Sequence, residues 1–137
     1  VHLKGTTSDV NNNSIVCLVD YGEVSFLFTG DLDFEGQEYL LQQGSRLTAD
    51  VLKYPHHGSR LALNPSFLAA VSPLACVISV GANPFGQPSP AVLAFLAGAG
   101  VSTYRTDLDG AVRVVTNGRS FRVIPTRRNL LPKGERS

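Results

Sequence analysis

Two stretches of this 137-residue sequence join a short apolar run to side chains that could bind metals. In the first, residues 24–28 lead through Thr-Gly into Asp31; in the second, residues 51–54 lead through a proline into His56 and His57. Short apolar runs of this length are typical of buried strands. Carboxylate oxygen and imidazole nitrogen are the ligands of hydrolytic zinc and manganese sites. If the two strands lie parallel, their carboxyl ends place all three side chains at one edge of the sheet.

Each of these residues also has a plain structural interpretation. Asp31 could be a turn or helix-capping aspartate, although Asp33 competes for that task. An exposed pair of histidines is usually inert. Adjacent histidines on extended backbone point in different directions, so one metal rarely takes both. We therefore expect His56 and His57 to have separate roles, one as a ligand and one as a proton donor or phosphate contact.

Polar residues before the first strand could face the same site. Asn12, Asn13 and Ser14 precede the strand expected at residues 15–21. Their side chains could contact a substrate phosphate or orient a metal-bound water. The alternative is a plain polar loop.

Other residues near the strand ends are weaker candidates. Ser59 could hold its loop by a hydroxyl-to-backbone bond, and Gln87 lies on another strand-end loop that could face the site. Lys53 alternates with a buried leucine and could either reach solvent or meet an anion. Phe85 and Tyr54 are predicted to be packing residues rather than platforms for stacking bases.

The composition is that of one folded domain with a core, because 43% of the residues are hydrophobic and 17% are charged. The net charge is +1, but residues 125–137 hold four basic side chains and one acidic one, +3, which leaves −2 for the rest. A body of that charge does not favour nucleic-acid binding by electrostatics alone.

The cysteines, the termini and the hydropathy carry less information. Cys17 and Cys76 each lie in an apolar run, so we expect buried free thiols, with nothing to support a disulfide. No apolar run approaches the ~18 residues of a transmembrane helix, and we expect no signal peptide. The sequence begins without Met, and we interpret it as a piece of a longer protein.

The turn and capping signals predict an α/β (α+β) domain. Strands are predicted at residues 1–3, 15–21, 24–28, 51–54, 76–80, 101–105, 111–115 and 120–124, helices at 34–43, 65–71 and 91–97, loops at 5–13 and 81–88, and a turn at 107–110. Asn117-Gly118 predicts a type I′ hairpin turn. Strands and helices in this order give a mixed sheet with helices on one face and an apolar second face that needs a partner. We expect a domain over residues 1–124 and a basic, disordered tail or linker over 125–137.

Together these motifs resemble the metallo-β-lactamase-like domain at the C-terminus of ComEC-type competence DNA-uptake proteins. The matching residues are Asn11-Asn12-Asn13-Ser14, Thr29-Gly30-Asp31, Pro55-His56-His57-Gly58-Ser59, residues 79–88 and Thr106-Asp107-Leu108-Asp109-Gly110-Ala111. The resemblance covers about residues 10–116, and only the joint occurrence of the motifs is specific. It implies an αββα sandwich of two similar halves, of which this chain is the second.

The resemblance also implies a site. Asp31 would be shared between two divalent metals, zinc or manganese, and His57 would be a ligand, with His56 beside it. Phosphorylcholine esterases of the same fold have a similar spacing and use the second histidine of the pair, which ranks His57 above His56. His56 and Asn12 would then be catalytic residues.

The implied function is degradation, by a metal-dependent phosphodiesterase or nuclease, of the DNA strand that is not taken up. Asn13, Ser14, Ser59 and Gln87 would contact the substrate. The parent protein would lie in the bacterial cytoplasmic membrane, with this domain in its soluble part. The expected partners are single-stranded DNA, the membrane channel region of the parent and the missing N-terminal half of the domain.

Two features depart from the family pattern. The His-x-Asp/His-x-Asp-His motif, which supplies most metal ligands, does not occur in this chain, and Gly86-Gln87-Pro88 stands where relatives often have Gly-His-Pro. Asp31 and His57 alone leave one or two protein ligands for each metal, and a catalytic zinc usually has three. The chain alone is therefore expected to bind metal weakly or not at all, and to be inactive.

Two alternative functions stay open. The chain could be a non-catalytic, structural or DNA-guiding part of an uptake channel, or it could belong to another phosphoesterase of the same fold. In each case an exposed apolar sheet face should make the isolated chain self-associate or rearrange.

Overall fold

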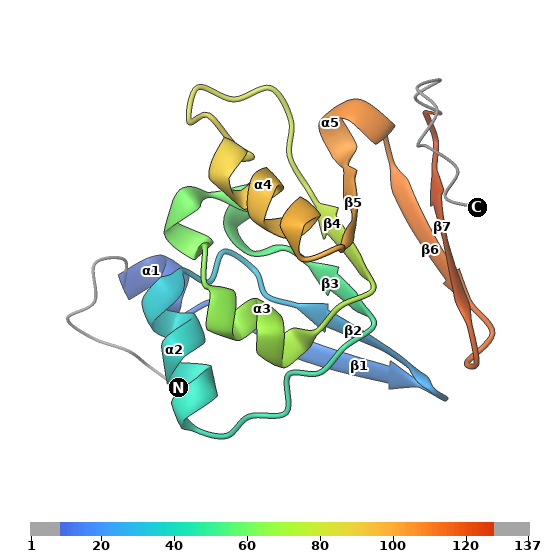
Figure 1. Ribbon diagram of the computed structural model, residues 1–137, viewed down its shortest axis with the longest axis horizontal. Coiled ribbons are helices and arrows are strands. Elements are labelled where there is room, and N and C mark those ends of the chain that lie inside the picture. Colours follow the sequence, from blue (N-terminus) through green and yellow to red (C-terminus); the bar gives the residue numbers. More distant parts are fainter. Residues whose placement is uncertain (1–8, 128–137) are drawn as a thin grey trace.

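A computed structural model describes residues 9–127 (Figure 1). In chain order the elements are α1 (Asp9–Asn12), β1 (Cys17–Tyr21), β2 (Val24–Phe28), α2 (Phe34–Gln42), β3 (Val51–Lys53), the 3-10 helices η1 (Pro55–Gly58) and η2 (Arg60–Ala62), α3 (Pro65–Val71), β4 (Ala75–Ile78), α4 (Pro90–Gly98), β5 (Ser102–Arg105), α5 (Thr106–Asp109), β6 (Val112–Thr116) and β7 (Phe121–Pro125). The predicted order of strands and long helices is confirmed over these residues. The strand predicted at residues 1–3 lies outside them.

The main sheet is mixed, as predicted for this α/β (α+β) fold. Its strand order is β1-β2-β3-β4-β5, with β1 antiparallel to β2 and the other neighbours parallel. The last registered pair between β2 and β3 joins Phe28 to Lys53. Strands β2 and β3 therefore end side by side at the same edge of the sheet, and the candidate ligands follow there.

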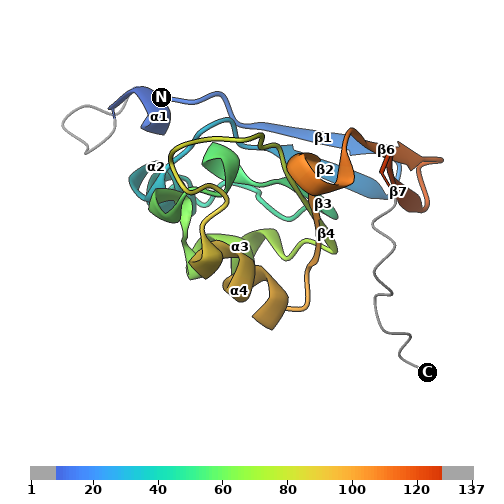
Figure 2. The ribbon, with the colours of Figure 1, turned by 90° about the horizontal axis from the view of Figure 1, so that it is seen from above.

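Helices α2, α3 and α4 cover one face of this sheet, as the two perpendicular views show (Figures 1 and 2). Helix α3 begins where Asn64 and Pro65 predict, and the Asn64 side chain accepts a hydrogen bond from the Phe67 amide at 3.1 Å. The core between sheet and helices consists of buried apolar side chains, chiefly Leu27, Leu52, Cys76, Ile78, Phe67, Val71, Val92 and Leu96.

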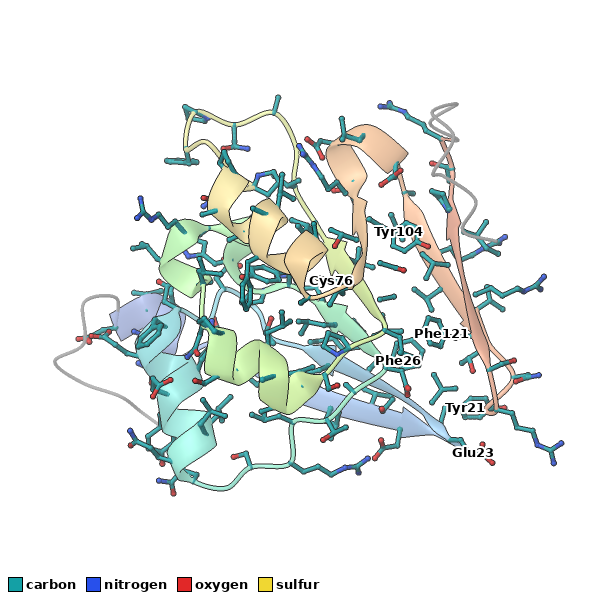
Figure 3. All side chains as sticks on the ribbon, in the orientation of Figure 1. Tyr21, Glu23, Phe26, Cys76, Tyr104 and Phe121 are labelled. Atoms are coloured by element: carbon teal, nitrogen blue, oxygen red, sulfur yellow. The ribbon has the colours of Figure 1, made fainter. Side chains whose placement is uncertain are left out.

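The second face of the sheet is only partly covered. Strands β6 and β7 form a separate antiparallel pair, and a groove of about 290 Å³ runs between β6 and the sheet, lined by Phe26, Val77 and Val112 among others. Figure 3 shows Phe26 and Phe121 between the sheet and this hairpin. Val19 and Phe28 remain 42% and 47% exposed, so apolar surface stays uncovered on this face.

The tips of the two hairpins are tied together. The Glu23 amide donates to the Gly118 carbonyl at 2.6 Å. Gly22 has φ +63°, and a Cβ there would lie 2.3 Å from that same carbonyl oxygen, so only glycine fits. This contact fixes where the β6–β7 hairpin lies along the sheet.

The turn between β6 and β7 is not the predicted type I′ turn. A type I′ turn needs positive φ at both central residues. Gly118 has a positive φ, but among residues 9–127 only His56, His57 and Ser72 are non-glycine residues with one. The Asn117 side chain instead accepts hydrogen bonds from the amides of Arg119 and Ser120, both at 3.0 Å. This local bond competes with the tighter turn.

Three further predictions are corrected. Residues 9–12 form helix α1 rather than part of a loop, and residues 106–109 form α5 rather than a turn. The start of the predicted tail is wrong, because Pro125 pairs with Val112 and the Thr126 and Arg127 amides bond to the carbonyls of residues 111 and 109; the rest of that prediction lies outside the described residues. Residues 125–127 therefore belong to the domain.

The two cysteines differ in environment. Both are free thiols; Cys76 is buried as predicted, but Cys17 is exposed, so the prediction for Cys17 is wrong. Cys17 lies on β1, an edge strand of the main sheet among residues 9–127. Burial raises the pKa of the Cys76 thiol. Within residues 9–127, no helix has the length and apolar character needed to cross a membrane.

Candidate functional site

The structure brings the two candidate metal ligands together. The carboxylate oxygen Oδ1 of Asp31 lies 3.5 Å from Nε2 of His57, and the side chains are 42% and 44% exposed. Both line a cleft of about 620 Å³, together with His56, Ser59 and Gln87. Five of the eight residues proposed from the sequence thus share one cleft at the carboxyl ends of β2 and β3.

The carbonyl of Gly30 holds these two strand ends in place. It accepts hydrogen bonds from the His56 amide at 3.2 Å and from Nζ of Lys53 at 2.7 Å. The Thr29 hydroxyl donates to the Lys53 carbonyl at 2.8 Å. Gly30 has φ +55°, and a Cβ there would lie 2.9 Å from Cβ of Ser14. Only glycine allows this turn so close to the neighbouring chain.

The histidine pair lies on left-handed backbone, not on the extended backbone that the sequence suggests. His56 has φ 45° and ψ 47°, and His57 has φ 53° and ψ 22°. This conformation costs about 1–2 kcal/mol for each residue, so contacts elsewhere must hold it. The rings still diverge, with centroids 6.3 Å apart and planes at 69°. Each imidazole therefore has its own hydrogen-bond partner.

The Nε2 atom of His57 faces Asp31. Its Nδ1 lies 2.7 Å from the Ser79 carbonyl. Since a carbonyl can only accept, Nδ1 carries the proton and Nε2 of the neutral ring is an acceptor. Two acceptors 3.5 Å apart repel each other unless the ring is protonated or a cation lies near both. Metal-binding histidines usually have this second hydrogen bond to a carbonyl, so the arrangement fits a cation site.

Lys53 already supplies positive charge beside Asp31. Its Nζ lies 3.8 Å from Asp31 Oδ1, which answers the question left open by the sequence: this lysine meets an anion. Burial lowers the pKa of Lys53, and the Asp31 charge opposes that shift. The carboxylate therefore lies between an ammonium group and an imidazole lone pair.

His56 is oriented by a buried carboxylate. Its Nδ1 lies 2.7 Å from Oδ1 of Asp33, whose side chain is 5% exposed. The other carboxylate oxygen of Asp33 accepts a hydrogen bond from the side-chain amide nitrogen of Asn11 at 3.1 Å. Asp33 occupies the N-cap position of α2, as predicted, but its side chain makes no capping bond. It is the site residue whose role the sequence analysis missed.

Asn12 caps α2 in place of Asp33. Its Oδ1 accepts from the Gly36 amide at 3.0 Å, and its Nδ2 donates to Glu35 at 2.9 Å. Asn12 is 4% exposed, so both amide atoms are committed to the start of the helix. The structure thus gives Asn12 a structural role, and the catalytic role that the resemblance implies stays a prediction.

The two residues after Asn12 also face away from the main cleft. Asn13 donates to the Asp9 carbonyl within α1, and the Ser14 hydroxyl accepts from the Asp31 amide at 3.1 Å. Both line a separate pocket of about 340 Å³. Ser14 positions the Asp31 backbone, whereas the sequence predicts that these two residues contact the substrate.

The remaining wall of the cleft is formed by two loops. The Ser59 hydroxyl accepts from the Leu61 amide at 3.2 Å, the backbone bond that the sequence predicts. Gln87 lies on the loop between β4 and α4. Tyr54 is buried as expected, but Phe85 on that loop is 79% exposed at the cleft. The prediction that Phe85 packs into the fold is wrong.

The donors fit a metal in type but not in number. Within the described part of the chain, no group of three or more His, Cys, Asp or Glu side chains could hold a metal ion. Asp31 and His57 provide one oxygen and one nitrogen, the ligand types of zinc and manganese. A complete site needs donors from outside residues 9–127.

Comparisons with known proteins find competence proteins among the relatives. No family model matches the chain. It is 33% identical over 118 residues to ComE operon protein 3 of Bacillus subtilis (84% of this chain, 15% of that protein). It is 41% identical over 107 residues to Competence protein ComA of Neisseria gonorrhoeae (77% and 16%), and 33% identical over 105 residues to Recombination protein 2 of Haemophilus influenzae (76% and 13%).

These similarities support a competence-related family of the ComEC type. The similarity extends over 76–84% of the chain. The chain spans only 13–16% of the length of these three relatives. The names of the relatives therefore describe much longer proteins, and a function for this chain must be argued from the cleft.

The Asp33–His56 contact generates a prediction about the imidazole tautomer. Replacing Asp33 with Asn removes the negative charge but keeps the shape. The hydrogen bond from His56 Nδ1–H to the side chain at position 33 would then lack a charged acceptor and weaken by about 1 kcal/mol. That loss corresponds to roughly a fivefold shift of the tautomer ratio. Proton–nitrogen correlation spectra of the histidine rings should show His56 moving from the Nδ1–H form toward the Nε2–H form.

His57 is the internal control, because the Ser79 carbonyl and not Asp33 fixes its tautomer. Asp20→Asn is the matched variant, since Asp20 is paired with Arg46 on the surface. An unchanged His56 spectrum in Asp33→Asn would contradict the orienting role.

Proposed function

We propose that this chain is part of a metal-dependent phosphodiesterase in a competence DNA-uptake protein, acting on the DNA strand that is not internalised. The observation that carries the proposal is the 3.5 Å approach of Asp31 Oδ1 and His57 Nε2, two acceptors at the ends of parallel strands. The names of the relatives support the process, DNA uptake. The nuclease activity rests on the cleft.

The side chains of the cleft have distinct roles in this proposal. Asp31 and His57 would hold a divalent metal, zinc or manganese, together with donors from outside the described residues, and a pair of such metals would supply an activated water for attack on a phosphodiester. His56, oriented by Asp33, contacts the phosphate or protonates the leaving oxygen. Ser59 and Gln87 form the wall against which the substrate lies. Lys53 adds positive charge beside Asp31.

The proposed fold is the second half of a metallo-β-lactamase-like αββα sandwich. The first half would lie upstream in the parent protein, cover the second face of the sheet and supply the missing metal ligands. The exposed Val19 and Phe28 on that face support this arrangement, as does the small share of the relatives that the chain spans. The parent would also contain the channel region in the cytoplasmic membrane.

One observation favours a second candidate, a non-catalytic DNA-guiding domain. The described residues offer only two metal donors at Asp31 and His57, and the cleft wall contains Gln87, whose amide is a poor ligand compared with imidazole. In that case the cleft would hold DNA without cleaving it. The activity of the parent protein distinguishes the two candidates.

Replacing Asp31 with Asn should abolish cleavage by the parent protein. The amide keeps the size of the side chain but loses the charge that holds metal, so we expect cleavage of single-stranded DNA with manganese to fall by about a hundredfold or more. A chelator should have the same effect on the wild type. Asp20→Asn, a surface carboxylate paired with Arg46, should cleave at the wild-type rate.

Equal cleavage by the Asp31→Asn and wild-type proteins would remove the metal role of Asp31. A wild-type parent that binds DNA but cleaves nothing would favour the DNA-guiding function. Hydrolysis of phosphorylcholine esters without cleavage of DNA would favour a different phosphoesterase of the same fold.

The uncovered sheet face should make the isolated chain self-associate. Phe28 contributes exposed apolar area to that face, so Phe28→Gln should weaken association in sedimentation velocity experiments. Phe34→Gln is the matched control, because Phe34 on α2 has nearly the same exposure, 46% against 47%, on the opposite side of the sheet. A wild-type chain that stays monomeric at about 100 μM would contradict this expectation.

A further inference from the structure

An exposed aromatic ring stands at the cleft that holds the candidate phosphodiester site. Phe85 is 79% exposed, and it lines the same cleft as Asp31 and His57. A large apolar side chain with that exposure contributes little to the core. Because the ring lies at the cleft of Asp31 and His57, it could bind a ligand that has an apolar face.

The side chain of Asn83 holds the loop that carries Phe85. The Asn83 oxygen accepts from the Phe85 amide at 3.0 Å and from the Gln87 amide at 3.1 Å. Its nitrogen donates to the carbonyls of Gly81 at 2.9 Å and Gln87 at 2.7 Å. All four hydrogen-bonding positions of the amide are used, so the loop keeps its shape without packing the phenyl ring.

The same loop is tied to the histidine turn. The Ser89 amide donates to the Gly58 carbonyl at 2.9 Å. Gly58 has φ +81°, and a Cβ there would lie 2.6 Å from Cβ of Pro88, so the two backbones are in close contact. The backbone of the loop that carries Phe85 is therefore tied to the turn that carries His57.

An exposed cation lines the same cleft. Arg60 follows the histidine turn on η2, and its side chain makes no ion pair or hydrogen bond with any other residue of the described range 9–127. Its neighbour Leu61 is 64% exposed beside it. The cleft thus offers a flat apolar ring and a guanidinium group, which match the base and the phosphate of a nucleotide.

We propose that Phe85 and Arg60 form a binding subsite for one unpaired nucleotide, with the base stacked on Phe85 and its phosphate at Arg60. The proposal rests on the proposed phosphodiesterase function and adds the means of selecting its substrate. In a duplex the faces of the bases are covered by their neighbours, so they cannot stack on a ring at the cleft. An unpaired strand leaves base faces available, and stacking tolerates any sequence.

The test is binding of short oligonucleotides to the metal-free chain, measured by fluorescence anisotropy at low salt. The probes are dye-labelled oligothymidylate, an abasic strand with the same number of phosphates, and a hairpin duplex. The wild type should bind oligothymidylate more tightly than the other two. Phe85→Ala should lose about tenfold in affinity for oligothymidylate and nothing for the abasic strand, and Phe85→Tyr should retain wild-type binding.

Arg60→Ala should weaken binding of oligothymidylate and the abasic strand alike. It should also reduce the slope of log affinity against log salt concentration by about one. Matched controls lie far from the cleft. Tyr21→Ala removes an aromatic side chain that is 59% exposed at the β1–β2 hairpin, and Arg119→Ala removes a basic one on the β6–β7 hairpin. Both should bind all three probes as the wild type does.

Three results would overturn the subsite: no binding of oligothymidylate, equal losses for the thymidylate and abasic strands in Phe85→Ala, or equally tight binding of an oligo-aspartate peptide. The assay requires neither metal nor cleavage. Failure of the nuclease with a normal Phe85 effect would therefore overturn the activity and leave the subsite. Normal cleavage by the nuclease without a Phe85 effect on binding would overturn the subsite and leave the activity.

Discussion

The carbonyl oxygen of Gly30 is the contact on which the site depends. It receives both the Lys53 ammonium group and the His56 amide, so the end of β2 and the turn after β3 form one unit. Without these hydrogen bonds, the parallel register of β2 and β3 would fix the direction in which the two strands end. It would not fix the positions of the side chains that follow them. With these hydrogen bonds, Asp31 and His57 face each other across the cleft at 3.5 Å.

An exchange of capping residues at the start of α2 allows the contact between Asp33 and His56. A helix needs an acceptor for its first amides, and Asp33 stands where that acceptor is usually found. Because Asn12 supplies the acceptor from α1, the Asp33 carboxylate is free to bind His56. The left-handed turn at His56 and His57, unfavourable in itself, is held by this bond and by the Ser79 carbonyl. The polar residues before β1 therefore act by supporting the site.

Much of the fold and part of the site follow from the sequence. Apolar runs and the Asn64-Pro65 signal predict the strands and α3, and the logic of parallel strand ends predicts that Asp31 and His57 meet. The Asn12–Asp33 exchange could not be predicted, because it joins elements distant in sequence and both residues have ordinary local roles. The exposure of Phe85 also escaped prediction, since it depends on how Asn83 holds its loop. Local propensity cannot decide between such alternatives; tertiary contacts do.

The central claim is that Asp31 and His57 share a cation site, and paramagnetic broadening by manganese tests it most directly. Substoichiometric Mn²⁺ added to the nitrogen-labelled chain detects even weak binding. The account predicts that the His57 ring and the amides around Asp31 broaden first, and that Asp31→Asn removes this effect while Asp20→Asn does not. Broadening that instead spreads over surface carboxylates, and is unchanged in Asp31→Asn, would contradict the account.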